Sequence, residues 1–129
     1  MKSVAQKNEM NGSGVRELSF EFALRVVKLC RFLEKEKKEY VLSRQLLKSG
    51  TAIGALIREA QQAESRANFI HKLSIALKEA NETEYWIDLL YQSQLIEKKG
   101  YESIKPDIVE LLKLLTSIIK STKNRRDNG

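Results

Sequence analysis

Few side chains in this sequence could carry out catalysis. The chain has one histidine, His71, and the residue three positions before it is Asn68. Metal centres in helical proteins use Glu-x-x-His pairs, whose two side chains project to one side of a helix and ligate the same ion. Three residues could supply carboxylate oxygens to a metal: Glu59, Glu79 and Glu82. The chain has no further histidine to supply the nitrogen ligands of such a centre. We therefore expect no catalytic metal and no cofactor.

The single cysteine, Cys30, is expected to be a small buried side chain and not a nucleophile. It lies with Val26 and Leu33 on the apolar side of a helical pattern, and no histidine is near it in the sequence. A lone cysteine also excludes an intramolecular disulfide. His71 falls beside the apolar pattern of its own segment, so we expect it at the surface. The sequence predicts a protein that is not an enzyme.

The charge of the chain indicates a different chemistry, the binding of a polyanion. The 129 residues carry a formal net charge of +6, and the pI is about 9.5. Residues 16–38 contain seven Lys or Arg against four acids, whereas residues 67–99 contain four against five. A basic first half and an acidic third segment suit either nucleic-acid binding or the pairing of subunits.

Two rows of basic residues are the candidate binding residues. Each row shares one face of a predicted helix, because helical positions three, four or seven apart lie on the same side. The rows are Arg25, Lys28 and Lys35, and Arg44, Lys48 and Arg58. We interpret them as a surface that binds RNA or DNA electrostatically. Because a solvated helix also carries Lys and Arg, the alternative is a protein–protein interaction scaffold, or an accessory subunit of a nucleic-acid enzyme, whose charges serve self-assembly.

Composition and periodicity place these rows on an all-α fold. One proline and six glycines are too few for a β-sandwich or barrel. Apolar residues recur at helical spacing in four segments with short connections, which predicts an antiparallel, up-down-up-down four-helix bundle over residues 16–123. The predicted helices are 16–36, 43–63, 66–94 and 103–122, between a disordered tail at 1–15 and a basic tail at 124–129.

No segment of the sequence has the pattern of a membrane or export signal. The longest apolar runs are far shorter than the ~20 residues that a membrane span needs. The residues after Met1 do not resemble a signal peptide. We therefore expect a soluble, cytoplasmic protein.

Local signals indicate where the helices begin and end. Ser43 and Ser65 are expected N-caps, with hydroxyls that accept a free backbone N–H. Gly100 is expected to stop the third helix, and Pro106 to lie in the first turn of the fourth. Glu59, next to an apolar position of the second helix, is expected to be partly buried and to fix helix register through a polar contact.

Small residues predict close packing between helices. Gly50 and Gly54 lie four apart in the second helix, where an interior glycine costs about 1 kcal/mol relative to alanine. Another backbone is therefore expected to approach them. The third helix has the best apolar heptad of the chain: Phe69, Leu73, Ala76, Ala80, Thr83, Ile87 and Leu90. We expect the patch of Ala76 and Ala80 to face the two glycines, and Trp86 to lie in the core or in a subunit contact.

The centre of the chain resembles a known family. Residues 45–60, QLLKSGTAIGALIREA, resemble the second-helix signature of four-helix-bundle proteins related to ribosomal RNA intervening-sequence proteins. Residues 65–69, SRANF, and 73–86, LSIALKEANETEYW, resemble the third-helix signature. The family pattern usually has Asn where this chain has Leu56 and often Asp where it has Asn68, so no role of those residues is carried over.

The resemblance has implications for assembly and partners. It implies a homopentameric barrel of bundles. It also implies kinship with the accessory variability protein of diversity-generating retroelements, which binds nucleic acid and a reverse transcriptase through a basic surface. The expected partners are thus further copies of the chain, RNA or DNA, and a reverse-transcriptase-like or other protein, and not a membrane.

Overall fold

The computed structural model describes residues 13–128 and confirms the all-α bundle. This part of the chain contains four helices and no strand: α2 (Ser13–Glu36), α3 (Val41–Gln61), α4 (Arg66–Gln92) and α5 (Lys98–Asn128). Of the predicted tail 1–15, residues 1–12 lie outside the described part, but residues 13–15 are helical, and Val15 is buried. None of the described helices has an apolar stretch long enough to cross a lipid bilayer.

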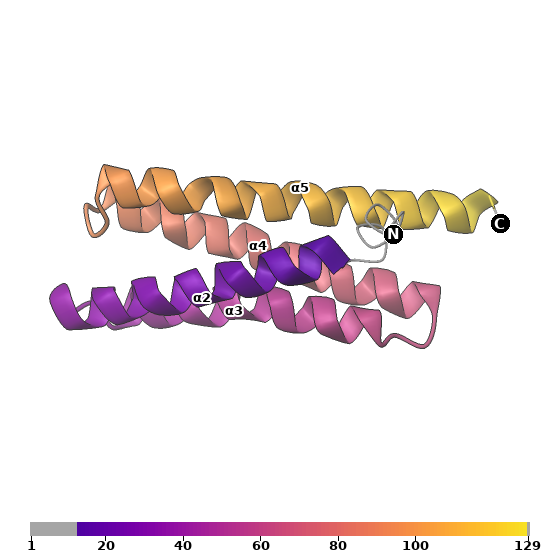
Figure 1. Ribbon diagram of the computed structural model, residues 1–129, viewed down its shortest axis with the longest axis horizontal. Helices are drawn as coiled ribbons and strands as arrows, with labels where there is room; N and C mark the ends of the chain where they lie inside the picture. The colour runs from indigo at the N-terminus through magenta and orange to yellow at the C-terminus, as the bar shows by residue number, and fades with distance from the viewer. Residues whose placement is uncertain (1–12, 129) are drawn as a thin grey trace.

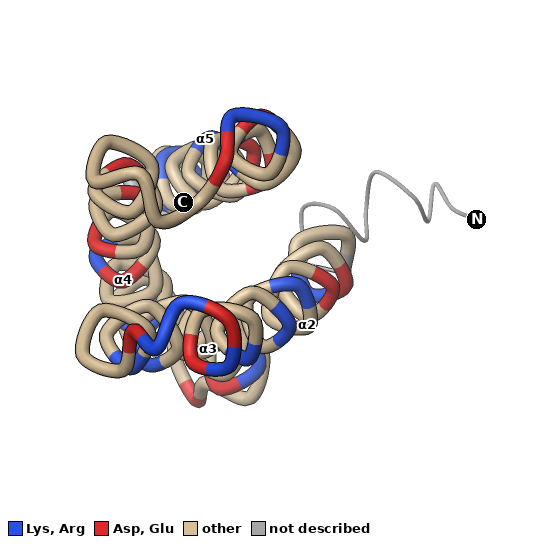
Figure 2. The backbone as a smooth tube through the Cα atoms, turned by 90° about the vertical axis from the view of Figure 1, so that its left-hand side faces the viewer, with Lys and Arg blue, Asp and Glu red and all other residues tan. Residues whose placement is uncertain are grey.

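The helices follow one another around an open bundle. Helix α3 packs against both α2 and α4, and α4 packs against α5, whereas α2 and α5 make few contacts with each other. Figure 1 shows the antiparallel course of the helices, and the end-on view of Figure 2 shows α2 and α5 as the two ends of an open ring. The α2–α5 seam is therefore the least closely packed of the four neighbouring helix pairs.

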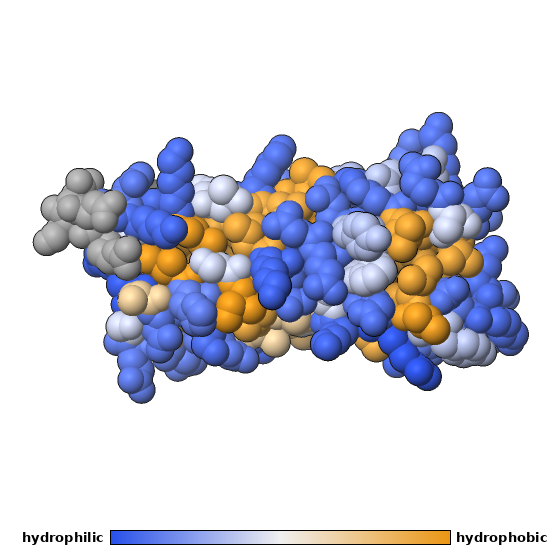
Figure 3. Space-filling view, turned by 180° about the vertical axis from the view of Figure 1, so that it is seen from behind, coloured by the Kyte–Doolittle hydropathy of each residue, from blue (hydrophilic) through white to orange (hydrophobic). Residues whose placement is uncertain are grey.

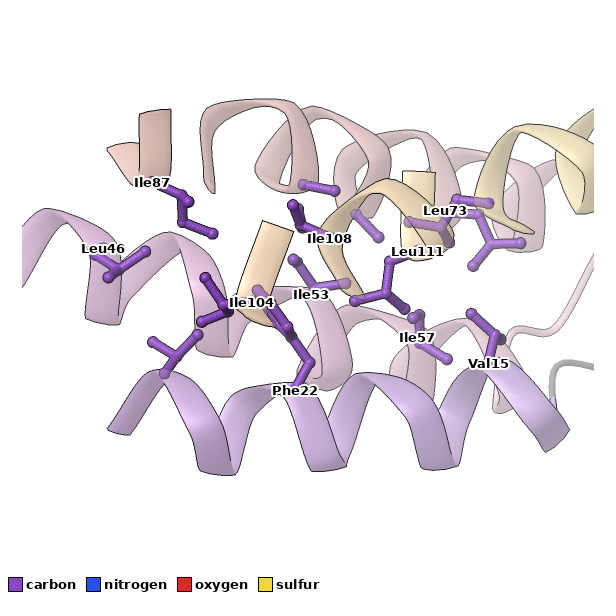
Figure 4. Close-up of a cluster of buried hydrophobic side chains, with 14 of the residues drawn as sticks. Val15, Phe22, Leu46, Ile53, Ile57, Leu73, Ile87, Ile104, Ile108 and Leu111 are labelled. Carbon is purple, nitrogen blue, oxygen red and sulfur yellow. The ribbon is translucent and has the colours of Figure 1, made fainter. Parts of the chain in front are cut away.

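The core follows the helical apolar stripes. Figure 4 shows Phe22 of α2 and Ile53 of α3 pointing into the space between the helices. On α4 the heptad prediction holds from Leu73 to Leu90, but Phe69 is only partly buried, and Ile70 takes the core position beside it. The buried residues of α4 are Ile70, Leu73, Ala76, Ala80, Thr83, Ile87 and Leu90.

One of the two predicted N-caps is correct. The Ser65 hydroxyl accepts the backbone N–H of Asn68 at 3.0 Å, directly before α4. Ser43 is wrong as a cap, because α3 already begins at Val41 and Ser43 is buried inside it. Its Oγ lies 3.2 Å from the carbonyl oxygen of Cys30 on α2. The start of α3 is instead served by Glu39, whose carboxylate accepts the N–H of Leu42 at 2.9 Å.

The predicted boundary between the third and fourth helices is also wrong. Helix α4 ends at Gln92, and the left-handed residue of the following turn is Gln94, with φ of 66°. Gly100 and Pro106 both lie inside α5. A proline at that interior position removes one backbone hydrogen bond of the helix, so contacts with α4 must hold the early turns in place. These contacts are described below.

The two patches of small residues do not face each other. A Cβ on Gly50 would lie 3.0 Å from both methyl groups of Val26, and one on Gly54 would lie 3.3 Å from Ser19 Oγ. Both glycines thus allow the close approach of α2, not of α4. Adjacent residues are about 100° apart around a helix, so Ser49, next to Gly50, faces α4 instead. Its Oγ lies 2.9 Å from the Oγ1 of Thr83. Ala76 and Ala80 are fully buried in the core.

Candidate nucleic-acid interface

Helices α2 and α3 lie side by side in a register that the small residues set. Gly50 meets Val26, and the Cys30 Sγ donates to the carbonyl oxygen of Ser43 at 3.2 Å. Lys28 is two residues after Val26, and Lys48 is two residues before Gly50 on the antiparallel neighbour. The two lysines therefore lie at the same level of the helix pair.

Five of the six predicted binding residues are exposed and form no ion pair with any side chain in the described part of the chain. They are Lys28, Lys35, Arg44, Lys48 and Arg58. Arg31 has the same properties but was missed, although its position three residues after Lys28 could have placed it on the same face. We call Lys28, Arg31, Lys35, Arg44 and Lys48 the α2–α3 basic cluster. It consists of two rows, one on each helix, because Lys28 and Lys48 each lie about 160° around the helix from the residue that contacts the neighbouring helix. Lys and Arg positions along both helices are blue in Figure 2.

Arg25, the sixth predicted residue, does not belong to this cluster. Its Nη1 lies 2.5 Å from Asp107 Oδ2 and donates to the carbonyl oxygen of Ser103 at 3.0 Å. Its Nη2 donates to Ser103 Oγ at 2.5 Å. The guanidinium therefore connects α2 to α5 across the weakly packed seam, and its charge is paired with Asp107. Its part in binding stays a prediction.

Arg58 has a different environment from the basic cluster. Its guanidinium carbon lies 5.3 Å from the centroid of the Phe20 ring, within the range of a cation–π contact. Phe20 is 48% exposed, and Leu24, one turn further along α2, is 44% exposed. We call Phe20, Leu24 and Arg58 the Phe20 patch. It joins exposed apolar area to a cation, a composition typical of protein interfaces.

The acidic segment of α4 is partly neutralised inside the chain. Lys105 of α5 lies 2.6 Å from Asp88 Oδ1 and 3.2 Å from Glu84 Oε2. Tyr101 donates its hydroxyl to the same oxygen of Asp88 at 2.8 Å, and its ring stacks on Tyr91. These contacts bind residues 98–105 to α4, which explains why α5 begins before Pro106.

The protonation of this cluster follows from its contacts. Burial acts to lower the pKa of Lys105, but the hydrogen bonds with Asp88, Tyr101 and Glu84 outweigh burial and raise it. The hydrogen bond to Asp88 likewise raises the pKa of Tyr101. Lys105 therefore stays charged and paired, and it offsets one of the two negative charges of Glu84 and Asp88 within the chain. Farther from α5, Glu82 accepts the indole N–H of the half-buried Trp86 at 3.3 Å.

The surroundings of the residues considered for catalysis do not favour a catalytic role. Cys30 is buried, and burial raises the pKa of its thiol, which disfavours the nucleophilic thiolate. His71 is exposed, as expected. Glu59 is not partly buried as predicted: its side chain is 54% exposed and forms an ion pair with Lys72 at 2.9 Å. Among residues 13–128, no three His, Cys, Asp or Glu side chains gather as metal ligands would.

Comparisons with known proteins confirm the family resemblance. A crystal structure from Bacteroides thetaiotaomicron, described as a protein with unknown function from the S23 ribosomal protein family, is 58% identical in sequence, with a TM-score of 0.83. The match covers 85% of this chain and 98% of that one. No curated protein matches the chain. The family model described as 23S rRNA-intervening sequence protein matches residues 13–117, which include most of the bundle. The chain therefore belongs to the 23S rRNA-intervening sequence protein family.

Proposed function

We propose that this protein is a non-enzymatic, oligomeric bundle that binds RNA or DNA electrostatically through the α2–α3 basic cluster. The observation that carries the proposal is the presence of five exposed cations on two adjacent helices, with no ion pair to a described side chain. Membership of a family named after a 23S rRNA intervening sequence is consistent with an RNA ligand.

The local charge of the cluster supports this function. Glu34, the acid on α2 between Arg31 and Lys35, has its Oε2 3.3 Å from the Ser43 hydroxyl and is partly buried. It is thus directed toward α3 and not into the row of cations. Neutralising phosphates with such a row releases condensed counterions, which favours binding and makes affinity depend steeply on salt.

A charge-matched pair of variants tests this function. The first variant is Lys28→Gln, Arg44→Gln, Lys48→Gln. For this variant the slope of log affinity for duplex RNA against log salt concentration is expected to decrease in magnitude by about 2–3, because each lost phosphate contact releases about one counterion fewer. The control Lys78→Gln, Lys99→Gln, Lys113→Gln removes the same charge from exposed sites on α4 and α5. Fluorescence anisotropy over a salt series measures both. Equal slopes for the two variants, or salt-independent binding, would contradict the proposal.

The Phe20 patch favours a protein contact as the second part of the function. Exposed aromatic and apolar side chains beside an arginine are characteristic of interface centres. The face shown in Figure 3 also displays apolar residues in patches between hydrophilic ones, so the molecule offers apolar area that a second copy could cover. We propose that copies of the chain assemble through the Phe20 patch. The pentamer implied by the family resemblance remains a prediction.

Substitution of Phe20 tests the assembly. Phe20→Glu is expected to lower the particle mass in light scattering toward the 14.8 kDa of one chain, because a carboxylate would be desolvated in the contact. Phe32→Glu is the control, since Phe32 is similarly exposed on α2 but lies about 120° around the helix. A wild-type mass of one chain, or the same mass for all three proteins, would rule out this contact.

A further inference from the structure

A cavity of about 740 Å³ lies at the end of the bundle opposite the α2–α3 connection. Figure 1 shows that the start of α2, the α3–α4 connection and the last turns of α5 all approach this end. The cavity is lined from three helices by three arginines, Arg16 of α2, Arg66 of α4 and Arg125 of α5. Arg16 is twelve residues from Lys28, which corresponds to about 18 Å along α2. The cavity is thus separate from the α2–α3 basic cluster.

The positive charge of this cavity is only partly compensated within the described part of the chain, because three arginines face one acid. None of the three arginines forms an ion pair with a side chain described there, and Glu64 is the one acid in the lining. The helix termini do not supply the charge, because α3 ends and α4 begins beside the cavity, and their dipoles oppose each other. The arginines therefore determine its potential, and a bound anion would relieve their mutual repulsion.

The side chains of the lining indicate the class of anion. A guanidinium presents a planar set of donors that matches two oxygens of a phosphate, and arginines from separate helices can hold adjacent phosphates. Ser65 and Thr122 also line the cavity, but the Thr122 hydroxyl donates to the carbonyl oxygen of Ile118 at 2.7 Å and the Ser65 hydroxyl caps α4, so the arginines are its main donors. Phe69 is the one large apolar side chain of the lining. An apolar ligand would find little to contact. The partly buried Phe69 ring could instead stack on a base.

We propose that this cavity binds a ligand with two or more linked phosphates, on Arg16, Arg66 and Arg125. Two sources share that chemistry, a free nucleoside triphosphate and the 5′-triphosphate end of an RNA chain. The inference goes beyond the proposed function, because it concerns different residues and a small phosphorylated group instead of a nucleic-acid backbone.

Calorimetric titration of the full chain with inorganic pyrophosphate tests the site. The variant Arg16→Gln, Arg66→Gln, Arg125→Gln is expected to bind pyrophosphate at least about tenfold more weakly, since charge-assisted hydrogen bonds are lost. The control is the triple variant Lys78→Gln, Lys99→Gln, Lys113→Gln, which removes an equal charge from exposed sites on α4 and α5. Its affinity is expected to stay within about twofold of the wild type, because those residues do not line the cavity. Absence of binding at low salt, or equal weakening in both variants, would overturn the proposal.

A conservative variant separates a built site from charge alone. Arg66→Lys keeps the charge but removes the two-pronged donor, so an affinity loss of at least about threefold is expected. Unchanged affinity would contradict specific recognition by Arg66. Since Arg66 is exposed, folding is expected to be unaffected, and thermal unfolding verifies this for each variant.

Two RNAs of one sequence, ending in a 5′-triphosphate or a 5′-hydroxyl, identify the source. A preference for the triphosphate end that disappears in the Arg16, Arg66, Arg125 variant assigns the cavity to RNA ends. Competition by ATP without any such preference assigns it to free nucleotides. If there is no preference for the triphosphate end and no competition by ATP, the proposal is overturned. Binding of the hydroxyl-ended RNA tests the α2–α3 basic cluster separately, so failure of one hypothesis is distinguishable from failure of the other.

Discussion

Phe22→Ala is expected to lower the free energy of unfolding by about 3–5 kcal/mol. Phe22 is 1% exposed and is among the largest fully buried side chains. Removing the ring loses its transfer free energy and leaves a cavity that the neighbouring helices fill only in part. Figure 4 shows the ring beside Ile104 of α5. The substitution thus weakens the least closely packed of the four neighbouring helix pairs.

Phe20→Ala is the matched control, because Phe20 lies two residues away on the same helix but is half-exposed. Urea denaturation at low protein concentration, where assembly contributes least, is expected to give a change within about 0.5 kcal/mol for this variant. Similar losses for the two substitutions would show that α2 does not pack in the core as described.

Elements with a strong apolar period could be predicted well. The expected spacing in the third helix places Leu73, Ala76 and Ala80 at buried positions, and all three are buried. Periodicity succeeds here because burial of one stripe is decided mainly by the sequence of that helix. The difference between Phe69 and Ile70 arises at the first turn, where neighbouring elements determine which side is covered.

The start of α5 could not be predicted from local signals. Gly100 and Pro106 favour a break by their intrinsic backbone preferences. The contacts of Tyr101 and Lys105 with Asp88 on α4 outweigh those preferences and extend the helix past both residues. Such partners are far from local in the sequence, and a propensity argument does not include them.

In the candidate site, too, features set by a single helix could be predicted, whereas contacts between residues distant in the sequence could not. That most of the predicted cations are exposed follows from their opposition to the apolar stripes of α2 and α3. The ion pair of Arg25 could not be predicted in this way. Its partner Asp107 is 82 residues away, on a helix that α2 contacts only along a weakly packed seam. The cavity with Arg16, Arg66 and Arg125 was missed for the same reason. Its residues have no common spacing and meet only through the topology of the bundle.

Gly50→Leu is expected to destabilise the fold by about 3 kcal/mol, the upper part of the usual range for overpacking. Even a Cβ at this position would lie 3.0 Å from two methyl groups of Val26, so a longer side chain must push α2 away from α3. Gly54→Leu is expected to cost about 1–3 kcal/mol, because its nearest neighbour is the Ser19 hydroxyl at 3.3 Å. Ala55→Leu, at an exposed position of the same helix, is the control and is expected to change stability by less than about 0.5 kcal/mol.

A double variant shows whether the cost of Gly50→Leu comes from the Val26 contact. Val26→Ala alone loses buried methyl groups and should itself be destabilising. Combined with Gly50→Leu, however, the missing methyls leave room for the new side chain, so the double variant should be more stable than the sum of the two single changes implies. Denaturant midpoints of the four proteins measure this coupling. Strict additivity would mean that the glycine is required for a reason other than the approach of α2, and the register on which the α2–α3 basic cluster depends would lose its physical basis.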